Sequence, residues 1–266
     1  MRRLLVTGGT GYLGGELVRQ AVLAGWEVTA TYLSTEPPAV TAAHWCRLDV
    51  TDGLAVPGLV GALDPDAVIH TAYLREGPRA EEVTVGGAAT VARAARASGA
   101  RLLQLSTDVV FDGERAGRYA EDDPPRPVSR YGTDKVAAER AVLAADPHAL
   151  VVRTSLLYGG PAPGPPEVAA LEAAQGERDE VFFADEVRCP TQVGDLAAAG
   201  LATDRLRAGN SRDLGLVRPR NCALDSSRAA RIVTAPPRGV FEVLGAPDGR
   251  PTDRAAGAEP VTQGNN

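Results

Sequence analysis

The sequence is poor in the features that mark metal proteins, disulfide-bonded proteins and membrane proteins. Its three cysteines, Cys46, Cys189 and Cys222, are odd in number and far apart, which favours reduced thiols. The three histidines are equally scattered, so we expect no metal site. No stretch approaches the roughly 20 apolar residues that span a bilayer. The short apolar run at 4–6 is also too brief for a signal peptide. These absences predict a cytoplasmic protein with no membrane partner.

The charge balance excludes a further class of partner. A net charge of −6 leaves no basic footprint for nucleic acid. A chain of 266 residues can bury one large core, or build a main domain with a small lobe. The partner we expect is therefore a small-molecule substrate, and a homodimer remains open.

A glycine-rich loop follows the apolar run at 4–6. Its glycines stand three apart, ahead of an apolar helix pattern, so the chain can turn sharply and bring backbone N–H groups to a pyrophosphate. The alternative interpretation is a simple turn between a strand and a helix. The residues predicted to bind the cofactor here are Gly8, Thr10, Gly11, Tyr12, Leu13 and Gly14.

The second strand pattern bears on the choice of cofactor. An acidic residue often binds the ribose hydroxyl at the end of this strand. Here the strand ends at Tyr32, and the missing acid favours NADP(H) over NAD(H). Against this, no arginine stands at the strand end, and Glu36 is close in sequence.

Strand patterns alternate with helix patterns along most of the chain. Strands are predicted at 3–7, 26–32, 44–48, 67–70, 101–106 and 149–154, and helices at 12–24, 81–97, 129–145 and 193–208. This alternation predicts an α/β fold with a Rossmann-type doubly wound parallel sheet and a small C-terminal substrate lobe. We assign residues 1–158 and the helix near 193–208 to the Rossmann domain, 159–192 and 210–250 to the lobe, and 251–266 to a mobile tail.

Two residues further along carry candidate chemistry. Tyr131 and Lys135 are four apart on a predicted helix and share one face. A lysine ammonium beside a phenol would lower the pKa of that phenol from about 10, and the tyrosine could then donate a proton to a carbonyl oxygen. Taken alone, the pair also fits an ordinary amphipathic helix.

The segment upstream of Tyr131 favours the catalytic interpretation of this pair over an ordinary amphipathic helix. The run Leu105-Ser106-Thr107-Asp108-Val109-Val110-Phe111-Asp112-Gly113 closes the fifth strand pattern, where open parallel sheets bind ligands. With the glycine loop and the Tyr-Gly-x-x-Lys spacing, it resembles the extended short-chain dehydrogenase/reductase family, and within it the dTDP-4-dehydrorhamnose reductase branch. The stretches at 153–159, 190–197 and 221–227 are also similar to that branch.

The resemblance implies roles for the matched positions. Thr107 would hold the substrate carbonyl, Tyr131 would donate the proton, and Lys135 would tune Tyr131 and hold the nicotinamide ribose. The remaining matched residues would line the cofactor, with the first pair at the adenine: Asp49 and Val50, then Thr71, Ala72 and Tyr73.

The sequence departs from the branch mainly at positions that would contact the substrate. Val109 and Leu156 stand where the branch usually has Tyr and Trp, and Arg188 stands where it has Gly. Val83-Thr84-Val85 lacks the family Asn that helps to relay protons. We therefore predict substrate contacts from Val109, Leu156 and Arg188, a wider and less aromatic pocket, and a substrate other than dTDP-4-dehydrorhamnose.

Three functions remain open at this stage. The first is an NAD(P)H-dependent ketoreductase acting on a deoxysugar nucleotide or a related metabolite. The second is a regulatory, non-catalytic relative that keeps the cofactor, like the regulatory subunit of methionine adenosyltransferase. The third, an epimerase or dehydratase, is disfavoured because dehydratases place Asp-Glu after the Thr, and here Val109 follows Asp108.

Overall fold

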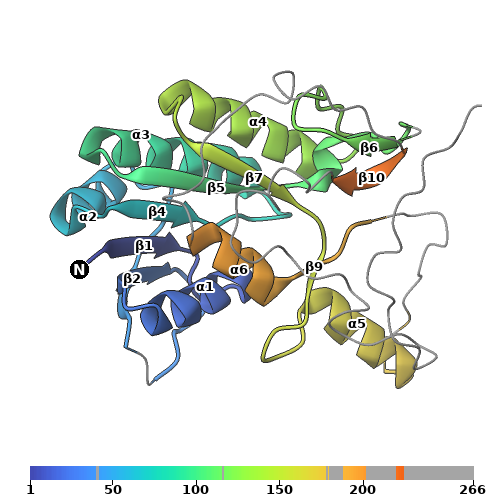
Figure 1. Ribbon diagram of the computed structural model, residues 1–266, viewed down its shortest axis with the longest axis horizontal. Coiled ribbons are helices and arrows are strands. Elements are labelled where there is room, and N and C mark those ends of the chain that lie inside the picture. The colour runs from blue at the N-terminus through green and yellow to red at the C-terminus, as the bar shows by residue number, and fades with distance from the viewer. Residues whose placement is uncertain (40–41, 116, 178, 180–187, 202–219, 225–266) are drawn as a thin grey trace, which may run out of the picture.

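A parallel sheet of six strands forms the centre of the molecule (Figure 1). The computed structural model describes residues 1–39, 42–115, 117–177, 179, 188–201 and 220–224. The strands follow the order β3-β2-β1-β4-β5-β7, and every neighbouring pair is parallel. Their bounds are β1 Arg3–Thr7, β2 Glu27–Tyr32, β3 His44–Arg47, β4 Ala67–His70, β5 Arg101–Thr107 and β7 Leu150–Thr154. The order reverses between β1 and β4, and this confirms the Rossmann-type doubly wound sheet.

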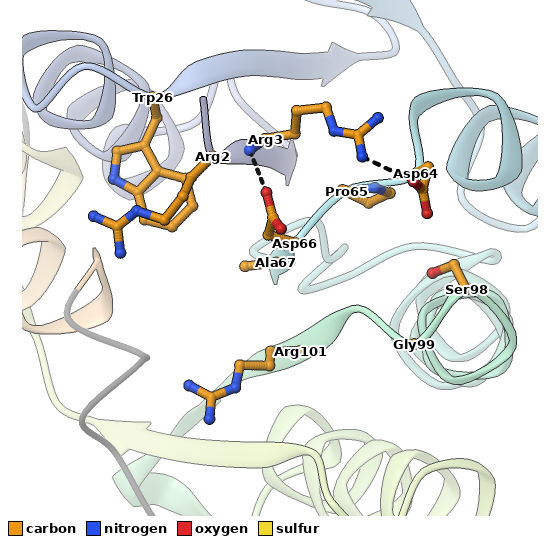
Figure 2. A pocket seen from close by; sticks show the side chains of 10 residues that line it. All are labelled: Arg2, Arg3, Trp26, Asp64, Pro65, Asp66, Ala67, Ser98, Gly99 and Arg101. Atoms are coloured by element: carbon orange, nitrogen blue, oxygen red, sulfur yellow. Dashed lines mark hydrogen bonds and ion pairs between the residues drawn. The ribbon is translucent and has the colours of Figure 1, made fainter.

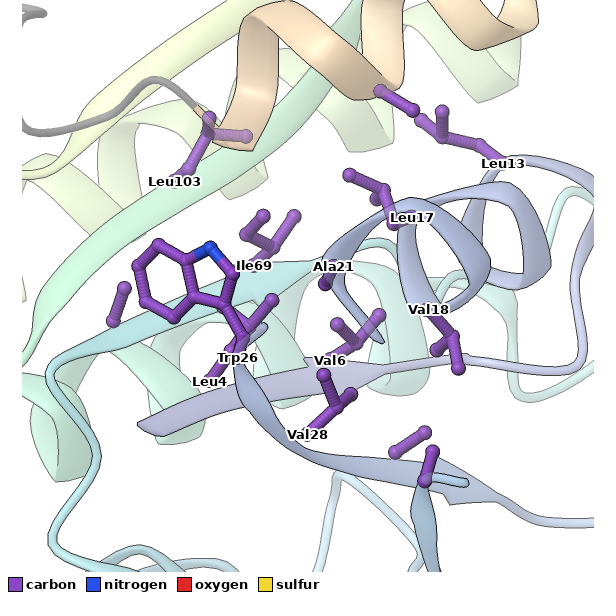
Figure 3. Close-up of a cluster of buried hydrophobic side chains, with 14 of the residues drawn as sticks. Leu4, Val6, Leu13, Leu17, Val18, Ala21, Trp26, Val28, Ile69 and Leu103 are labelled. Atoms are coloured by element: carbon purple, nitrogen blue, oxygen red, sulfur yellow. The ribbon is translucent and has the colours of Figure 1, made fainter. Parts of the chain in front are cut away.

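Helices cover both faces of the sheet. Helices α1 (Tyr12–Leu23) and α6 (Val193–Leu201) lie on one face, and α2 (Ala55–Leu63), α3 (Ala88–Ser98) and α4 (Arg130–Ala145) on the other (Figure 1). Successive residues of β1 point to opposite faces. Leu4 and Val6 pack under α1, as Figure 3 shows, whereas Leu5 joins the cluster beneath α2, α3 and α4. Burial on both faces explains why the strands are apolar throughout.

The six predicted strands are confirmed to within one residue at either end. The predicted helix at 81–97 is in fact a π-helical turn, η1 (Glu82–Gly87), followed by α3. Two helices were not predicted. Helix α2 contains Pro57 and two glycines, which hide its pattern, and α5 (Pro165–Ala174) begins in a stretch that reads as a loop. Pro165 at its first turn suits a helix start, and the Glu167 carboxylate accepts a hydrogen bond from Gly164 N at 2.7 Å.

Smaller elements lie beside the carboxyl end of the sheet (Figure 1). They are the 3₁₀ turn η2 (Asp108–Val110) and two short parallel pairs, β6 (Gly117–Tyr119) with β10 (Arg220–Leu224) and β8 (Leu157–Tyr158) with β9 (Thr191–Gln192). Most of the proposed lobe segment 210–250 and the whole tail 251–266 lie outside the described residues. The division into domains therefore stays a prediction.

Helix α6 returns to the Rossmann sheet and packs on α1 through Val193 and Ala197. It is described as far as Leu201, so the end predicted at 208 lies outside the described residues. In the part of the chain that the structure describes, no helix has the length and apolar character to cross a membrane.

A hollow opens at the amino edge of the sheet, and half of the residues that line it are charged (Figure 2). The Arg2 guanidinium lies over the Trp26 ring, 4.1 Å from its centroid, and Arg3 binds Asp64 at 2.8 Å. This edge is opposite the carboxyl ends of the strands, where doubly wound sheets bind their ligands. We therefore place the functional site elsewhere.

Candidate active site

The glycine loop forms a tight turn between β1 and α1. Gly8 adopts a left-handed conformation with φ of 73°, and Gly11 N donates to Gly8 O at 3.0 Å. A Cβ added to Gly14 would collide with the Gly8 carbonyl oxygen, so only glycine allows α1 to start this close to β1. The result is an open backbone cradle at a helix N-terminus. The residues present therefore fit a dinucleotide pyrophosphate.

The other residues predicted in the loop have distinct environments. Leu13 is buried in the core beneath α1, whereas Thr10 and Tyr12 are half-buried and Gly11 is exposed. The Tyr12 hydroxyl accepts from Gly160 N at 2.9 Å and donates to Glu167 at 3.2 Å. Tyr12 thus joins the cofactor loop to α5.

The segment after β4 lies directly against this loop. Thr71 Oγ1 donates to Thr7 O at 2.7 Å, and a Cβ on Gly8 would meet the backbone of Ala72. Tyr73 follows and is half exposed. Thr71, Ala72 and Tyr73 therefore follow β4 at the carboxyl edge of the sheet, beside the glycine loop, and their contact with a cofactor stays a prediction.

The residues predicted at the adenine follow β3. Asp49 accepts hydrogen bonds from Thr51 N at 3.0 Å, Thr51 Oγ1 at 2.7 Å and Arg79 Nη2 at 3.1 Å. These bonds, chiefly those from Thr51, hold the pKa of Asp49 below its usual range. Val50 is buried and packs on Gly87 of η1. The turn is thus held by hydrogen bonds and packing within the protein itself.

A cation lies beside Tyr32 that the sequence did not predict. In the β2–β3 register Tyr32 pairs with Arg47, the last residue of β3. The exposed Arg47 side chain reaches the residue that follows β2, where its Nε donates to Leu33 O at 3.1 Å. As expected from the sequence, β2 itself has no arginine at its end. The neighbouring strand β3 supplies one, and the sequence analysis did not predict it because strand register cannot be read from sequence.

Thr107 and Tyr131 meet at the carboxyl end of β5. Thr107 ends β5, and Tyr131 lies in the first turn of α4, whose N-cap Ser129 accepts from Gly132 N at 3.1 Å. A Cβ on Gly132 would collide with Val109 O, so glycine lets this turn of α4 sit against η2. The Thr107 side chain then lies close enough to the Tyr131 phenol to lower its pKa.

Lys135, the only lysine in the chain, is buried one turn further along α4. Its Nζ donates to the main-chain carbonyl of Leu105 in β5 at 2.6 Å. Burial lowers the pKa of Lys135 to about 8, and the nearby Glu139 carboxylate opposes this shift. The ammonium also lies 5.5 Å from the ring centroid of Tyr73, which in turn is 5.7 Å from the ring of Tyr131.

The expected lowering of the Tyr131 pKa is wrong for the protein without ligand. Its pKa is raised, above all because burial disfavours the phenolate, and Tyr73 and Asp108 add to the rise. The Arg75 guanidinium, 5.4 Å from the ring centroid, and the Thr107 side chain oppose it. Tyr131 therefore rests as the neutral phenol, the form that can donate a proton.

His70, at the end of β4, is fully buried and stays neutral. Its Nδ1 is hydrogen-bonded to Thr7 Oγ1 at 2.6 Å. Burial, with a smaller effect of the Lys135 charge, lowers the pKa of His70 to about 3. The site thus holds Lys135 as its cation while the imidazole beside it remains uncharged at neutral pH.

Of the three residues predicted at the substrate, two are partly exposed and the third binds another side chain of the protein. Val109 is half-buried in η2, and Leu156 is 37% exposed. Arg188 points inward and binds the carboxylate of Asp108 through two hydrogen bonds, of 2.8 Å from Nε and 2.6 Å from Nη2. Arg188 thus binds a carboxylate of the chain itself, and its contact with a substrate stays a prediction.

The doubly wound sheet, the glycine cradle and the Thr107, Tyr131 and Lys135 cluster together define an extended short-chain dehydrogenase/reductase, an NAD(P)-dependent oxidoreductase. The family model "RmlD substrate binding domain" matches residues 1–216, and the chain belongs to this family.

Individual relatives agree with this assignment. A dTDP-4-dehydrorhamnose reductase of Streptomyces griseus is 36% identical over 98% of this chain and 83% of its own length. The methionine adenosyltransferase 2 subunit beta of Rattus norvegicus is 31% identical over 74% of the chain, but only 60% of that protein is covered.

Two solved structures share the fold at moderate identity. The hypothetical dTDP-4-dehydrorhamnose reductase of Sulfolobus tokodaii superposes with a TM-score of 0.71 at 27% identity, covering 88% of this chain and 95% of that one. The enzyme of Bacillus anthracis, solved with NADP, gives 0.64 at 28% identity, covering 78% and 72%.

Proposed function

We propose that the protein is a ketoreductase that uses NAD(P)H to reduce a keto group on a deoxysugar nucleotide. Tyr131 is the general acid, Thr107 holds the carbonyl oxygen, and Lys135 holds the nicotinamide ribose. The assignment of the substrate class draws on the dTDP-4-dehydrorhamnose reductases to which the chain is similar.

One observation carries the proposal: the neutral phenol of Tyr131 lies near the Thr107 side chain and beside the Tyr73 ring, which also contacts the Lys135 ammonium, at the carboxyl edge of the sheet. Thr107 lies close enough to the phenol to lower its pKa, and the Tyr73 ring is 5.7 Å from the Tyr131 ring and 5.5 Å from the Lys135 ammonium. The segment that carries Tyr73 is bonded to the glycine loop through Thr71. The proton donor Tyr131 is thus connected, through Tyr73 and Thr71, to the glycine loop that would bind the pyrophosphate.

The chain's own residues divide the work of the reaction. A bound nicotinamide nucleotide supplies the hydride. The Thr107 hydroxyl binds the substrate carbonyl oxygen and orients it towards Tyr131, whose phenolic proton passes to that oxygen. The phenolate left behind is stabilised by the cations near it, Lys135 on α4 and Arg75 after β4. Backbone N–H groups at the start of α1 bind the pyrophosphate.

The preferred cofactor is NADP(H). The 2′-phosphate of NADP binds at the end of the second strand of such a sheet. There the chain presents Tyr32, which carries no charge to repel a phosphate, and the exposed guanidinium of Arg47 beside it. The similar enzyme of Bacillus anthracis, solved with NADP, is in keeping with this preference.

A regulatory, non-catalytic function is the second candidate. It is favoured by the exposed Leu156 in place of an aromatic residue and by the similarity to the methionine adenosyltransferase subunit. Elimination chemistry fits less well, because the carboxylate of Asp108 is buried and bound by Arg188 at both oxygens. It therefore cannot act as a free acid towards a substrate.

Incubation of the purified protein with NADPH and a panel of 4-keto nucleotide sugars tests the proposal. We expect oxidation of NADPH, followed by its absorbance, with at least one sugar and with the corresponding alcohol as product. NADPH binding without turnover on any member of the panel would instead support the regulatory function.

A further inference from the structure

Arg188 and Asp108 form the most enclosed ion pair next to the reacting groups. Nε of Arg188 binds Oδ2 at 2.8 Å, and Nη2 binds Oδ1 at 2.6 Å. The Asp108 side chain is 0% exposed and that of Arg188 is 21% exposed. Bidentate bonds of this kind fix the orientation of both partners. The residues are 80 positions apart in sequence, so the pair ties η2 to the segment that leads into β9.

The pair acts on Thr107 through the adjoining backbone and through a hydrogen bond. Thr107 Oγ1 donates to Asp108 Oδ1 at 3.3 Å and accepts from Val109 N at 3.4 Å. Both distances are long for hydrogen bonds. These contacts hold the hydroxyl weakly, so its single proton can leave Asp108 and be donated to a substrate carbonyl oxygen. The short bonds from Arg188 keep the carboxylate, and with it the η2 backbone, in place.

We propose that Arg188 is a positioning residue for the reduction: it clamps both oxygens of Asp108 and thereby fixes the backbone that carries Thr107 next to Tyr131. This inference rests on the proposed function. It assigns a role inside the site to a residue that does not itself reach the reacting atoms. It also explains why a buried carboxylate is tolerated next to the reacting phenol, since an unpaired charge there would be strongly unfavourable.

The role depends on the planar fork of arginine as well as on its charge. Lysine would retain one positive charge but could not bind both carboxylate oxygens in a fixed geometry. Arg188→Lys therefore separates positioning from charge compensation, and Arg188→Met removes both. Misplacement of a reacting group by about 1 Å costs up to about 100-fold in rate.

A matched control exists elsewhere in the protein. On α1, Arg19 binds the buried Glu16 carboxylate with the same bidentate geometry, at 2.8 Å and 2.6 Å. Arg19 belongs to neither the cofactor cradle nor the catalytic cluster. Arg19→Met therefore measures how much the loss of a bidentate arginine–carboxylate pair lowers the stability of the fold when no reacting group is involved.

The experiment compares kcat and KM for the wild type and these variants with NADPH and the best 4-keto nucleotide sugar. We expect kcat to fall about 10- to 100-fold in Arg188→Lys and Arg188→Met, with the KM for NADPH within twofold of wild type. Arg19→Met should lower the melting temperature and keep kcat. Unchanged kcat in both Arg188 variants would overturn the proposal.

A measurement without turnover tests the pair itself. A double-mutant cycle of Arg188→Met and Asp108→Asn, followed by thermal unfolding, should show that the double variant loses less stability than the single losses add up to. Additive losses would contradict the pair.

If Arg188→Met does not fold, Arg188→Lys and Asp108→Asn still provide the kinetic comparison. No turnover by the wild type would refute the proposed function, and the positioning role with it, whereas wild-type turnover with unaffected variants would refute the positioning role alone.

Discussion

The ammonium of Lys135 donates a 2.6 Å hydrogen bond to the main-chain carbonyl of Leu105, and so joins α4 to the strand that ends at Thr107. The buried ammonium of Lys135 is thus stabilised by a main-chain carbonyl oxygen of the sheet. Lys135 is the one lysine of the chain, and all the other residues in its Lys and Arg count are arginines. The compact ammonium fits a buried position where a guanidinium would need several acceptors.

Tyr131→Phe should keep the ring and remove the proton that the reaction needs. We expect turnover to fall by about 10²–10⁴-fold, the usual contribution of a general acid, with NADPH affinity nearly unchanged. Stopped assays for turnover and fluorescence titration of NADPH measure the two quantities. Tyr119→Phe, a buried phenol in β6, serves as the control. Wild-type turnover in Tyr131→Phe would rule out the assigned role.

Lys135 should lose its proton near pH 8, because burial lowers its pKa to about that value. Since the charged form holds the ribose and stabilises the phenolate, kcat/KM for NADPH should decline as pH rises through 8. Protein labelled with [6-¹³C]lysine will give one Cε resonance, whose titration reports this pKa directly. A resonance that titrates above pH 10 would contradict the prediction. Lys135→Ala should weaken both turnover and cofactor binding.

His70 should make the fold less stable in acid. Its pKa is lowered to about 3 in the folded state, against about 6.5 in the unfolded chain. Between these values the unfolded chain binds a proton that the folded protein does not, so stability rises with pH by up to about 1.4 kcal/mol per unit. Urea unfolding at pH 4 to 7 measures the slope. His70→Gln should reduce it, and His148→Gln, an exposed site, should not.

Arg47→Ala should weaken NADPH binding and leave NADH binding unchanged. A charge-assisted hydrogen bond to a phosphate contributes about 1.5–3 kcal/mol, which is about 10- to 150-fold in Kd. Calorimetric titration of both nucleotides tests this, with Arg96→Ala on the exposed side of α3 as control. An equal loss for NADH and NADPH would show that Arg47 does not meet the 2′-phosphate.

The pocket side chains should direct the protein away from dTDP-4-dehydrorhamnose. Val109 and the exposed Leu156 offer a sugar ring no aromatic surface. We expect kcat/KM for that sugar below ~10⁴ M⁻¹s⁻¹, under the normal range for an enzyme and its own substrate. The Val109→Tyr/Leu156→Trp variant should raise it relative to other 4-keto nucleotide sugars. Efficient wild-type turnover of dTDP-4-dehydrorhamnose would defeat the prediction.

The sequence by itself determined the sheet and the cofactor half of the site. Apolar strand runs have to be buried on both faces, and a glycine loop after the first strand has few uses, so the parallel sheet and its cradle followed from local pattern. The i, i+4 spacing likewise placed Tyr131 and Lys135 on one face of α4, because helix geometry is local.

Only the tertiary structure decided which groups meet across long sequence distances. Arg47 reaches the end of β2 through strand register, and Arg188 meets Asp108 across 80 residues. The pKa of Tyr131 was likewise decided by burial, which outweighs the effect expected of the neighbouring ammonium. Burial, register and long-range pairing depend on how the whole chain packs, and no local pattern encodes them.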